Sequence, residues 1–556
     1  MNTKKYLPLI LIIALAAFFR FYRLGSTPQG FFSDEVAVGY NAFSIIKTGK
    51  DEFGKVMPFF FKSFGEGKLP LYVYQAVPFV FLLGPTELAV RFPGALLGTL
   101  TVLALYWFTL ESLKLSKIKS SFHQTIALVA AFSLSIMPWH IHFSRGVFGQ
   151  ESLFWAILGS YLLLRGLANN HRLTSFFGFI SFTCSLLIYH SPKVILPLWI
   201  PIIFLLSKKK ISNLFKHSLL GGLITVVVWG LVTFNPLGMQ RAKGVSVFSQ
   251  YSGVSAKLHE SITEEGRLNR SILFARAMHN KAESYGREII GRYLSHFNPD
   301  LLFISGDTIR PRYRVPNQAQ MFIIFLPFLL LGTYLSIKKK FYLPLIFLLL
   351  APVPASMSFE TPSTVRALFM TPALATLTGL GLVSAINTTI KTKKLLVIIP
   401  TITLITLAFS YQTVSYFNAY FHLNDIHKPY AWQYGYKPLS AKLADLEDNY
   451  DHIVVTGMGG PPYIFLAFYQ QYDPTLLQEE INKNIGETDP FGFIHIKGFG
   501  KYTFPKETCP FDENATKTLF VCQKDGEGID RNHIIDSVYF KDKTPAFTIF
   551  DPEHEN

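Results

Sequence analysis

Long apolar stretches separated by short polar segments run through most of this chain. The first of them, 6–19, contains no charged residue. Further apolar stretches begin near residues 88, 125, 152, 174, 193, 217, 319, 341, 365 and 395. Because a helix needs about 20 predominantly apolar residues to cross a bilayer, this pattern predicts a polytopic α-helical membrane protein. One more stretch, 69–84, is shorter and contains Pro70 and Pro78.

Basic residues between the apolar stretches predict the orientation of the chain. Lys4 and Lys5 precede the first stretch, which places the N-terminus in the cytoplasm. No small-residue cleavage site follows this stretch, so we expect it to stay as a signal anchor. If 69–84 does not cross the membrane, the later basic groups also fall inside; they lie at 114–119, Arg172, 208–210, 338–340 and 391–394. If it crosses, they all fall outside. We therefore expect about eleven spans in the plasma membrane, with 69–84 as an interfacial or re-entrant helix.

This orientation gathers the unusual polar residues on the outer side of the membrane. The regions concerned are the loops 20–87, 139–151, 236–317 and 355–364 and the tail from about 412. Long loops are exempt from the positive-inside rule, so the basic loop 236–317 does not oppose this assignment. We expect a transmembrane domain over 1–411, with 20–87 as its first outer loop and 236–317 as its long outer loop, and an extracytoplasmic domain over 412–556.

The tail has the pattern of a small α/β domain. Short runs of β-branched and aromatic residues, bounded by turn residues, predict strands. These runs are 453–456, 491–496, 518–522, 534–540 and 547–550, and 463–472 is the predicted helix among them. Cys509 and Cys522 both lie in the tail and could form a disulfide if it faces an oxidising compartment, whereas Cys184 lies in an apolar run.

The composition supports a membrane protein and, with the placement of its charges, argues against nucleic acid as a partner. Of the 556 residues, 49% are hydrophobic and only 16% are charged, whereas a soluble domain carries about 25% charged residues. The net charge is +15, which is a common property of nucleic-acid-binding proteins. Much of this excess lies in the short runs that flank apolar stretches, such as 208–210 and 338–340. We interpret these runs as topology signals and expect no nucleic-acid partner.

An acidic pair, Asp34–Glu35, follows the first apolar stretch and marks the first outer loop as the candidate site. Ser33 opens an apparent helix that runs to Ile46, so the two carboxylates lie at a helix N-terminus, where they are stabilised electrostatically. Adjacent side chains on a helix point in different directions. One carboxylate is therefore available as a general base, while the other makes structural or acceptor contacts.

Four cations on the outer side are candidate ligands for a phosphate group. Lys68 lies between a glycine and Leu-Pro, just before the predicted interfacial helix. Arg145 lies near the predicted outer end of an apolar stretch, and Arg310 and Arg366 lie close to the starts of apolar stretches. Cations of this kind bind phosphate by charge-assisted hydrogen bonds. Snorkelling or pairing at the end of a span, for example between Arg145 and Glu151, is the alternative for each of them.

Taken together, these segments resemble the GT-C class of membrane glycosyltransferases. The resemblance is closest to the protein O-mannosyltransferase and aminoarabinose transferase superfamily, including its bacterial dolichyl-phosphate-mannose-type members, and it covers the chain to about residue 470. The residues that carry it are Asp34–Glu35, 40–44, Thr48–Gly49, Pro58, 67–72, 87–93, Ser144–Arg145, 297–307, 352–355, Arg366, 416–420 and 432–436.

This resemblance implies transfer of a sugar from a polyprenyl-phosphate donor on the extracytoplasmic face. It assigns the catalytic base to Asp34 with Glu35 beside it, and contact with the donor phosphate to Lys68. We extend the phosphate role to Arg145, Arg310 and Arg366, and place Tyr72, Gln150 and Glu151 among the other substrate contacts. The chain departs from some members, because Ala37 stands where they have an arginine. Gln150 and Glu151 are the nearest candidates for a second acidic role.

The chemistry agrees with this assignment. A carboxylate takes the proton of the acceptor, cations hold the departing phosphate, and one in-line displacement inverts the anomeric centre. A GT-C oligosaccharide ligase with a pyrophosphate donor is one alternative. A lipid or solute transporter is another, although we find neither the paired halves nor the midplane charges of an inverted-repeat transporter.

The expected partners are the donor lipid, the surrounding membrane lipids and an acceptor. A protein hydroxyl, a lipid-linked glycan and a lipid headgroup all remain open as the acceptor. A divalent cation is compatible with the chemistry, but no His, Cys, Asp and Glu cluster has metal-ligand spacing in the sequence.

Overall fold

A computed structural model describes residues 3–64, 66–207, 211–488, 493–526 and 528–554. The predicted basic run 208–210 and the first two residues of the predicted strand 491–496 lie outside these ranges. Backbone contacts divide the chain into two compact units. Unit 1 comprises 1–20, 96–144 and 148–414, and unit 2 comprises 21–95, 145–147 and 415–556. Each unit is described by itself.

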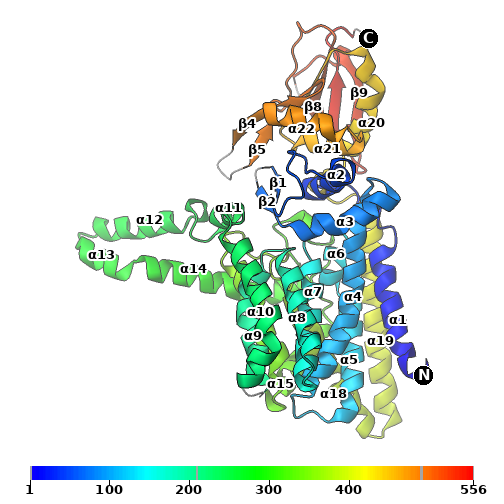
Figure 1. The fold of residues 1–556 in the computed structure, drawn as a ribbon, viewed down its shortest axis with the longest axis vertical. Helices are drawn as coiled ribbons and strands as arrows, with labels where there is room; N and C mark the ends of the chain where they lie inside the picture. Colours follow the sequence, from blue (N-terminus) through cyan, green and yellow to red (C-terminus); the bar gives the residue numbers. More distant parts are fainter. Residues whose placement is uncertain (1–2, 65, 208–210, 489–492, 527, 555–556) are drawn as a thin grey trace. The chain divides into compact units, whose positions relative to one another are not determined.

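Unit 1 is helical. Figure 1 shows its long helices side by side as a bundle. Those that lie wholly or mostly in it are α1 (Thr3–Phe21), α4 (Glu87–Leu113), α5 (His123–Ser135), α6 (Pro138–Phe143), α7 (Glu151–Ala168), α8 (Arg172–Leu186), α9 (Pro192–Leu206), α10 (Ile211–Phe234), α15 (Phe325–Lys338), α16 (Tyr342–Leu350), α17 (Val353–Ser356), α18 (Met370–Lys391) and α19 (Leu395–Asn418). The long loop adds α11 (Pro236–Val245), α12 (Val254–Arg267), α13 (Ile272–Met278) and α14 (Lys281–Ser295), the last three forming a lateral arm.

Glycines bring helices of the bundle into close contact. Gly332 of α15 faces Gly381 of α18, and a Cβ atom on either residue would overlap a backbone oxygen of the other helix. Gly178 of α8 similarly packs on the backbone of α7. Helices in a bilayer associate through such small residues, because lipid tails are as apolar as leucine and provide no hydrophobic drive.

Three helices in the described ranges are long and apolar enough to cross a membrane, namely 87–113, 370–391 and 395–423. Shorter apolar helices cover 7–21, 70–83, 192–206, 219–234, 325–338 and 342–356. The count of about eleven spans therefore stays a prediction. The doubtful stretch 69–84 forms α3 (Pro70–Leu83), whose 14 residues extend about 21 Å, less than the roughly 30 Å hydrocarbon core. Its interfacial or re-entrant placement stays a prediction, because predicted spans such as α15, also of 14 residues, are equally short.

Unit 2 combines the segment 21–95 with the tail. Its sheet has the strand order β6-β7-β3-β8-β10-β9. The strands are β3 (His452–Val455), β6 (Gly498–Phe499), β7 (Tyr502–Thr503), β8 (Thr518–Gln523), β9 (Ile534–Tyr539) and β10 (Pro545–Phe550). Two pairs lie apart from it, β1 (Phe61–Ser63) with β2 (Glu66–Lys68) and β4 (Ile485–Thr488) with β5 (Ile494–Ile496). The helices of this unit are α2 (Ser33–Thr48), α3, α20 (Tyr436–Leu446), α21 (Pro462–Tyr469) and α22 (Pro474–Lys483).

The α/β prediction for the tail is confirmed. The described part of every predicted strand overlaps an observed strand, and the predicted helix 463–472 overlaps α21. The sequence did not predict β4, β6 and β7, because strands of two to four residues contain too few positions to show alternation. In Figure 1, α2 lies beside α21, so the acidic pair of the first loop belongs to the same unit as the tail.

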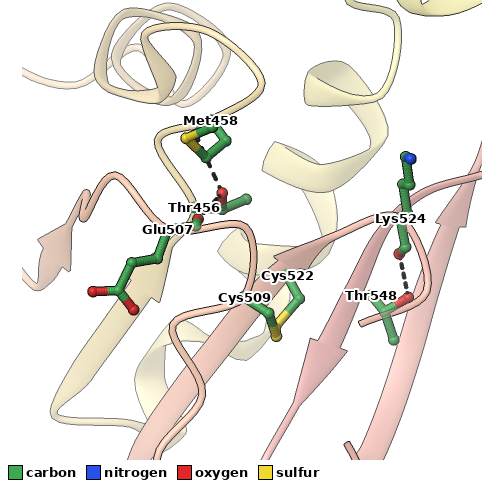
Figure 2. The surroundings of a disulfide bond; sticks show 7 residues. All are labelled: Thr456, Met458, Glu507, Cys509, Cys522, Lys524 and Thr548. Atoms are coloured by element: carbon green, nitrogen blue, oxygen red, sulfur yellow. Dashed lines mark hydrogen bonds between the residues drawn. A yellow bond between two sulfur atoms is a disulfide. The ribbon is translucent and has the colours of Figure 1, made fainter. Parts of the chain in front are cut away.

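A disulfide joins Cys509 to Cys522 within the tail, as the sequence allowed (Figure 2). Cys522 is buried in β8. The segment before Cys509 is also attached to the end of β3. Thr456 Oγ1, directly after that strand, donates to the carbonyl oxygen of Glu507 at 2.5 Å. The third cysteine, Cys184, is free and lies in α8.

This bond gives a test of the predicted orientation. If the tail is extracytoplasmic, an impermeant maleimide added to whole cells should label neither tail thiol before reduction, and it should label Cys509, the less buried of the two, after treatment with an impermeant reductant. The shift of the protein on a gel after labelling with a polymer-linked maleimide counts the reactive thiols. Cys184→Ser is the background variant, so that only the tail contributes. Labelling that occurs only after the cells are lysed, even when the reductant has been added, would contradict the outer placement.

Candidate active site

The first turn of α2 carries the acidic pair. The backbone at Phe32 is extended and the helix begins at Ser33, so Asp34 and Glu35 both lie where backbone N–H groups face outward. Glu35 accepts a hydrogen bond from Phe32 N at 3.3 Å, which is the return half of a capping box. The two carboxylates have different surroundings, as expected for neighbours on a helix.

Glu35 is held in a buried ion pair with Arg91. Arg91 Nε lies 2.9 Å from Glu35 Oε1 and Nη2 lies 2.8 Å from Oε2, and neither side chain is exposed. The same guanidinium donates to the carbonyl oxygens of Leu24, Pro28 and Gly30. A bidentate pair with its remaining donors satisfied is the geometry in which a buried charge is tolerated. Glu35 therefore fixes the start of α2 against α4 and the preceding loop.

Asp34 has a different environment, because its side chain is 39% exposed and forms an ion pair with Lys68. Lys68 ends β2, where it lies opposite Phe61 of β1, and its ammonium nitrogen lies 5.4 Å from the centre of the Phe64 ring. A partly exposed carboxylate at a helix N-terminus is available to accept a proton, and the ammonium group beside it is available to bind an anion. The structure thus brings together Asp34 and Lys68, two residues that are far apart in the sequence.

A third acidic residue, Glu52, lies buried near this pair. Its carboxylate accepts hydrogen bonds from Ser63 Oγ at 2.9 Å and Asn41 Nδ2 at 3.3 Å, and Tyr463 Oη lies 3.4 Å away. Burial raises the pKa of Glu52 to about 8, against weaker opposing effects of its hydrogen bonds and of Lys68. Glu52 therefore links α2, β1 and α21. Sequence analysis missed it, because an acidic residue in a polar loop gives no signal of burial.

The tail contacts α2 along its whole length. Ser33 N donates to Gln433 Oε1 at 2.9 Å, and Tyr40 Oη donates to the carbonyl oxygen of Tyr472 at 2.9 Å. At the other end, Gln478 Nε2 donates to Ser44 Oγ at 3.0 Å. The helix that presents Asp34 is thus supported by chain segments about 400 residues away in sequence.

Two other predicted site residues of unit 2 are buried in its interior. Arg145 is fully buried; its Nη2 donates to the carbonyl oxygens of Tyr22 and Thr27 at 2.8 and 2.7 Å, and its guanidinium lies over Tyr420. Tyr72 is also buried, with its hydroxyl 3.4 Å from the carbonyl oxygen of Val90. Both residues make contacts that hold the loop in place.

In unit 1, the two remaining predicted phosphate ligands converge on one carboxylate. Arg310 Nη2 lies 3.0 Å from Glu360 Oε1, and Arg366 Nη1 lies 3.0 Å from Glu360 Oε2. Arg366 also lines a cavity of about 400 Å³ with Lys193 and with apolar or aromatic side chains such as Trp229. An apolar cavity with a few cations suits an amphiphile that carries a negative headgroup.

Gln150 and Glu151 lie at the start of α7, in unit 1, and both are buried. Glu151 stands in the first turn, where the helix dipole stabilises a negative charge. In the described ranges, no group of three or more His, Cys, Asp or Glu side chains is arranged to hold a metal ion.

Two solved structures resemble this one over most of the chain. The archaeal oligosaccharyltransferase AglB from Archaeoglobus fulgidus, solved with an inhibitory peptide and a dolichol-phosphate, superposes with a TM-score of 0.50 at 13% identity, covering 84% of this chain and 64% of its own. ArnT from Cupriavidus metallidurans, bound to undecaprenyl phosphate, gives a TM-score of 0.52 at 12% identity and covers 97% of both chains. Both are GT-C glycosyltransferases. The chain has the GT-C fold.

The chain thus spans less than two thirds of the AglB structure but nearly the full length of ArnT. No family model and no curated protein sequence matches it. The predicted GT-C resemblance is confirmed at the level of the fold, whereas sequence identities of 12–13% carry no residue roles across.

The different environments of the two acidic residues predict different effects on stability. Glu35→Gln leaves the guanidinium of Arg91 buried without its counter-charge, so we expect a loss of about 3–5 kcal/mol in the free energy of unfolding. Asp34→Asn should change it by less than about 1 kcal/mol, because that pair is partly exposed. Thermal unfolding of the purified proteins in detergent measures both. Equal losses in the two variants would contradict the structural role of Glu35.

The raised pKa of Glu52 predicts a pH-dependent stability. Between the ordinary carboxyl pKa and about 8 the folded protein keeps a proton on Glu52 that the unfolded chain releases. The contribution of Glu52 to stability therefore falls as the pH rises through this interval and levels off above it. Melting temperatures measured from pH 5 to 9 should show this fall, and Glu52→Gln should flatten it. An unchanged slope in the variant would contradict a buried neutral Glu52.

Proposed function

We propose that this protein is an inverting glycosyltransferase that moves a sugar from a polyprenyl-phosphate donor to an acceptor hydroxyl on the extracytoplasmic side, with Asp34 as the general base. The observation that carries the proposal is the partly exposed Asp34–Lys68 pair at the N-terminus of α2, in a chain with the GT-C fold. A base and a phosphate-binding cation are the two groups that this reaction requires.

The donor class is supported by what the two similar structures hold. One contains dolichol-phosphate and the other undecaprenyl phosphate. Both ligands are long isoprenoid chains ending in a phosphate. A donor of this class confines its phosphate to the membrane surface, and an interfacial position of α3 beside Lys68 would place the ammonium at that depth.

In the proposed reaction, Asp34 accepts the proton of the acceptor hydroxyl while the oxygen attacks the anomeric carbon. The bond between that carbon and the phosphate oxygen breaks, and its electron pair leaves with the phosphate. Lys68 stabilises the resulting negative charge. Because its stem is long and flexible, the ammonium can leave Asp34 when the donor phosphate competes for it. Donor binding would then free the base.

Glu35 takes a positioning role in this proposal. Its carboxylate is fully buried and both its oxygens face Arg91, so it is not exposed to a substrate. By fixing the first turn of α2 it directs Asp34 to solvent. The sequence predicted that one carboxylate of the pair acts as a base and the other makes structural contacts. In this proposal Asp34 is the base and Glu35 makes the structural contacts.

The cavity at Arg366, which lies within unit 1, is a separate candidate site for an anionic lipid. Its apolar and aromatic walls suit isoprene units, while Arg366 and Lys193 suit a phosphate or another anionic headgroup. Glu360 bridges Arg366 and Arg310 in the ligand-free structure, so an incoming anion would compete with a carboxylate here as well.

Two substitutions test the catalytic pair. Asp34→Asn should lower transfer by at least about 100-fold, because the base is lost while the shape is kept. Lys68→Ala should raise the donor concentration needed for half-maximal rate more than it affects the acceptor. Release of polyprenyl phosphate from a synthetic polyprenyl-phosphate sugar, in membranes containing acceptor, measures both. Lys62→Ala is the matched control, since Lys62 lies on the neighbouring strand β1.

Normal turnover by Asp34→Asn protein would remove Asp34 as the base. Equal effects of Lys68→Ala on donor and acceptor would argue against a phosphate role for Lys68.

A further inference from the structure

The tail contains a cavity that the reaction described above does not use. Its volume is about 610 Å³, and it lies at the ends of β8 and β10, bounded by the β9–β10 hairpin, the turn at Gly459 and the segment 430–436. The rim is fixed, because Thr548 Oγ1 donates to the carbonyl oxygen of Lys524 at 2.7 Å and ties the end of β8 to β10 (Figure 2). Ligand pockets typically have volumes of about 300–1,000 Å³.

Aromatic rings form much of the wall. Tyr430, which is 59% exposed, and Phe540 and Phe547 all line the cavity. Tyr436 completes this wall; its ring stacks on Phe465 with the centres 4.2 Å apart and an angle of 9° between the planes. A set of rings held in this way offers flat apolar surfaces to a ligand.

A buried hydroxyl in the same wall has no partner within the described part of the chain. Tyr436 is 1% exposed, and its Oη makes no hydrogen bond there. The hydroxyl lies close to Gly459, which also lines the cavity, since a Cβ built on that glycine would be 3.2 Å from it. Leaving a buried hydroxyl unpaired costs about 1–3 kcal/mol, which a ligand with hydroxyl groups would recover.

The remaining polar groups point to a neutral ligand. Gln433 and Gln523 contribute amides, and the charges of Lys524 and Asp525 balance each other. Amides and a carboxylate can each pair with neighbouring hydroxyls, while the balanced charge gives no preference for an anion. An extended peptide that adds to a sheet needs an exposed edge strand, but β8 and β10 are interior strands of the sheet.

From this combination of rings, amides and an unsatisfied hydroxyl, we infer that the tail cavity binds a neutral carbohydrate, and that this carbohydrate is part of the acceptor. The inference rests on the proposed transferase function. Gln433 connects the two sites, because its Nε2 donates to the carbonyl oxygen of Gly459 at 3.1 Å while its Oε1 accepts from Ser33 N, next to Asp34. A glycan seated in the cavity lies against the segment that supports the catalytic helix.

Contacts between the segment 430–436 and the loop before α2 strengthen this connection. Phe32 packs edge-on against Trp432 with the ring centres 5.8 Å apart. Gly30 has a φ of +90° and lies so close to the backbone of Trp432 that a side chain there would overlap it. The wall of the cavity and the start of α2 are therefore held together by packing as well as by Gln433.

Binding measured without donor lipid tests the inference. Purified full-length protein in lipid nanodiscs is applied to an array of neutral oligosaccharides and, in parallel, to an array of synthetic peptides. We expect binding to a subset of the oligosaccharides. Tyr436→Phe, which removes only the hydroxyl, should weaken that binding about threefold to tenfold, and Asp525→Ala should weaken it as well. Tyr539→Phe and Asp445→Ala, which do not line the cavity, are the matched controls.

Unchanged glycan binding in both cavity variants, or no glycan binding by a protein that still transfers sugar, would overturn the inference while leaving the proposed function intact. Peptide binding that is lost in Tyr436→Phe protein would overturn the carbohydrate class. Glycan binding that follows the variants as expected, in a protein that releases no polyprenyl phosphate from any donor, would instead support the cavity and reject the transferase. An unchanged melting temperature of Tyr436→Phe protein shows that the fold is intact.

Discussion

The ion pair between Glu35 and Arg91 determines how the first outer loop is built. Both groups are withdrawn from water, so each depends on the other and on the carbonyl oxygens that fill the remaining donors of the arginine. Taking two charges out of water costs several kcal/mol per ion, and only a geometry with all donors satisfied repays it. Such a pair strongly disfavours other arrangements, which is why the start of α2 has one position relative to α4.

With Glu35 fixed in this way, the helix presents Asp34 to solvent beside Lys68. Neither residue alone is unusual. A lysine at the end of a short strand and an aspartate at a helix N-terminus are common surface features, and a partly exposed pair of this kind contributes little to stability. The partly exposed Asp34–Lys68 pair is thus available for chemistry, whereas the buried Glu35–Arg91 pair fixes the position of the first turn of α2.

The tail supports α2 directly. It supplies hydrogen bonds to both ends of α2, and the buried Glu52 joins that helix to β1 and α21. The segment 21–95 and the tail are consequently one compact unit, although most of the apolar helices lie between them in the sequence. If the tail cavity holds the acceptor, the segment that carries the acceptor and the helix that carries the base belong to the same body.

Sequence alone determined the features that depend on local pattern. The long apolar stretches indicated a membrane protein, and the alternation in the tail predicted the strands around β8 and β10. The acidic pair after Ser33 predicted the start of α2. These properties depend on the chemistry of neighbouring residues, which the sequence lists directly. The sequence allowed a bond between Cys509 and Cys522, and the structure contains it.

Only the tertiary structure decided the roles of residues that depend on distant partners. It separated Asp34 from Glu35 by burying one of them, placed Arg145 and Tyr72 in the interior, and brought Arg310 and Arg366 to the same carboxylate. It also revealed Glu52 and the unpartnered hydroxyl of Tyr436 within the described residues. Burial and pairing depend on partners outside the local sequence, such as Arg91, which lies 56 positions from Glu35. The free energy of a charge depends on these surroundings as well as on the residue type.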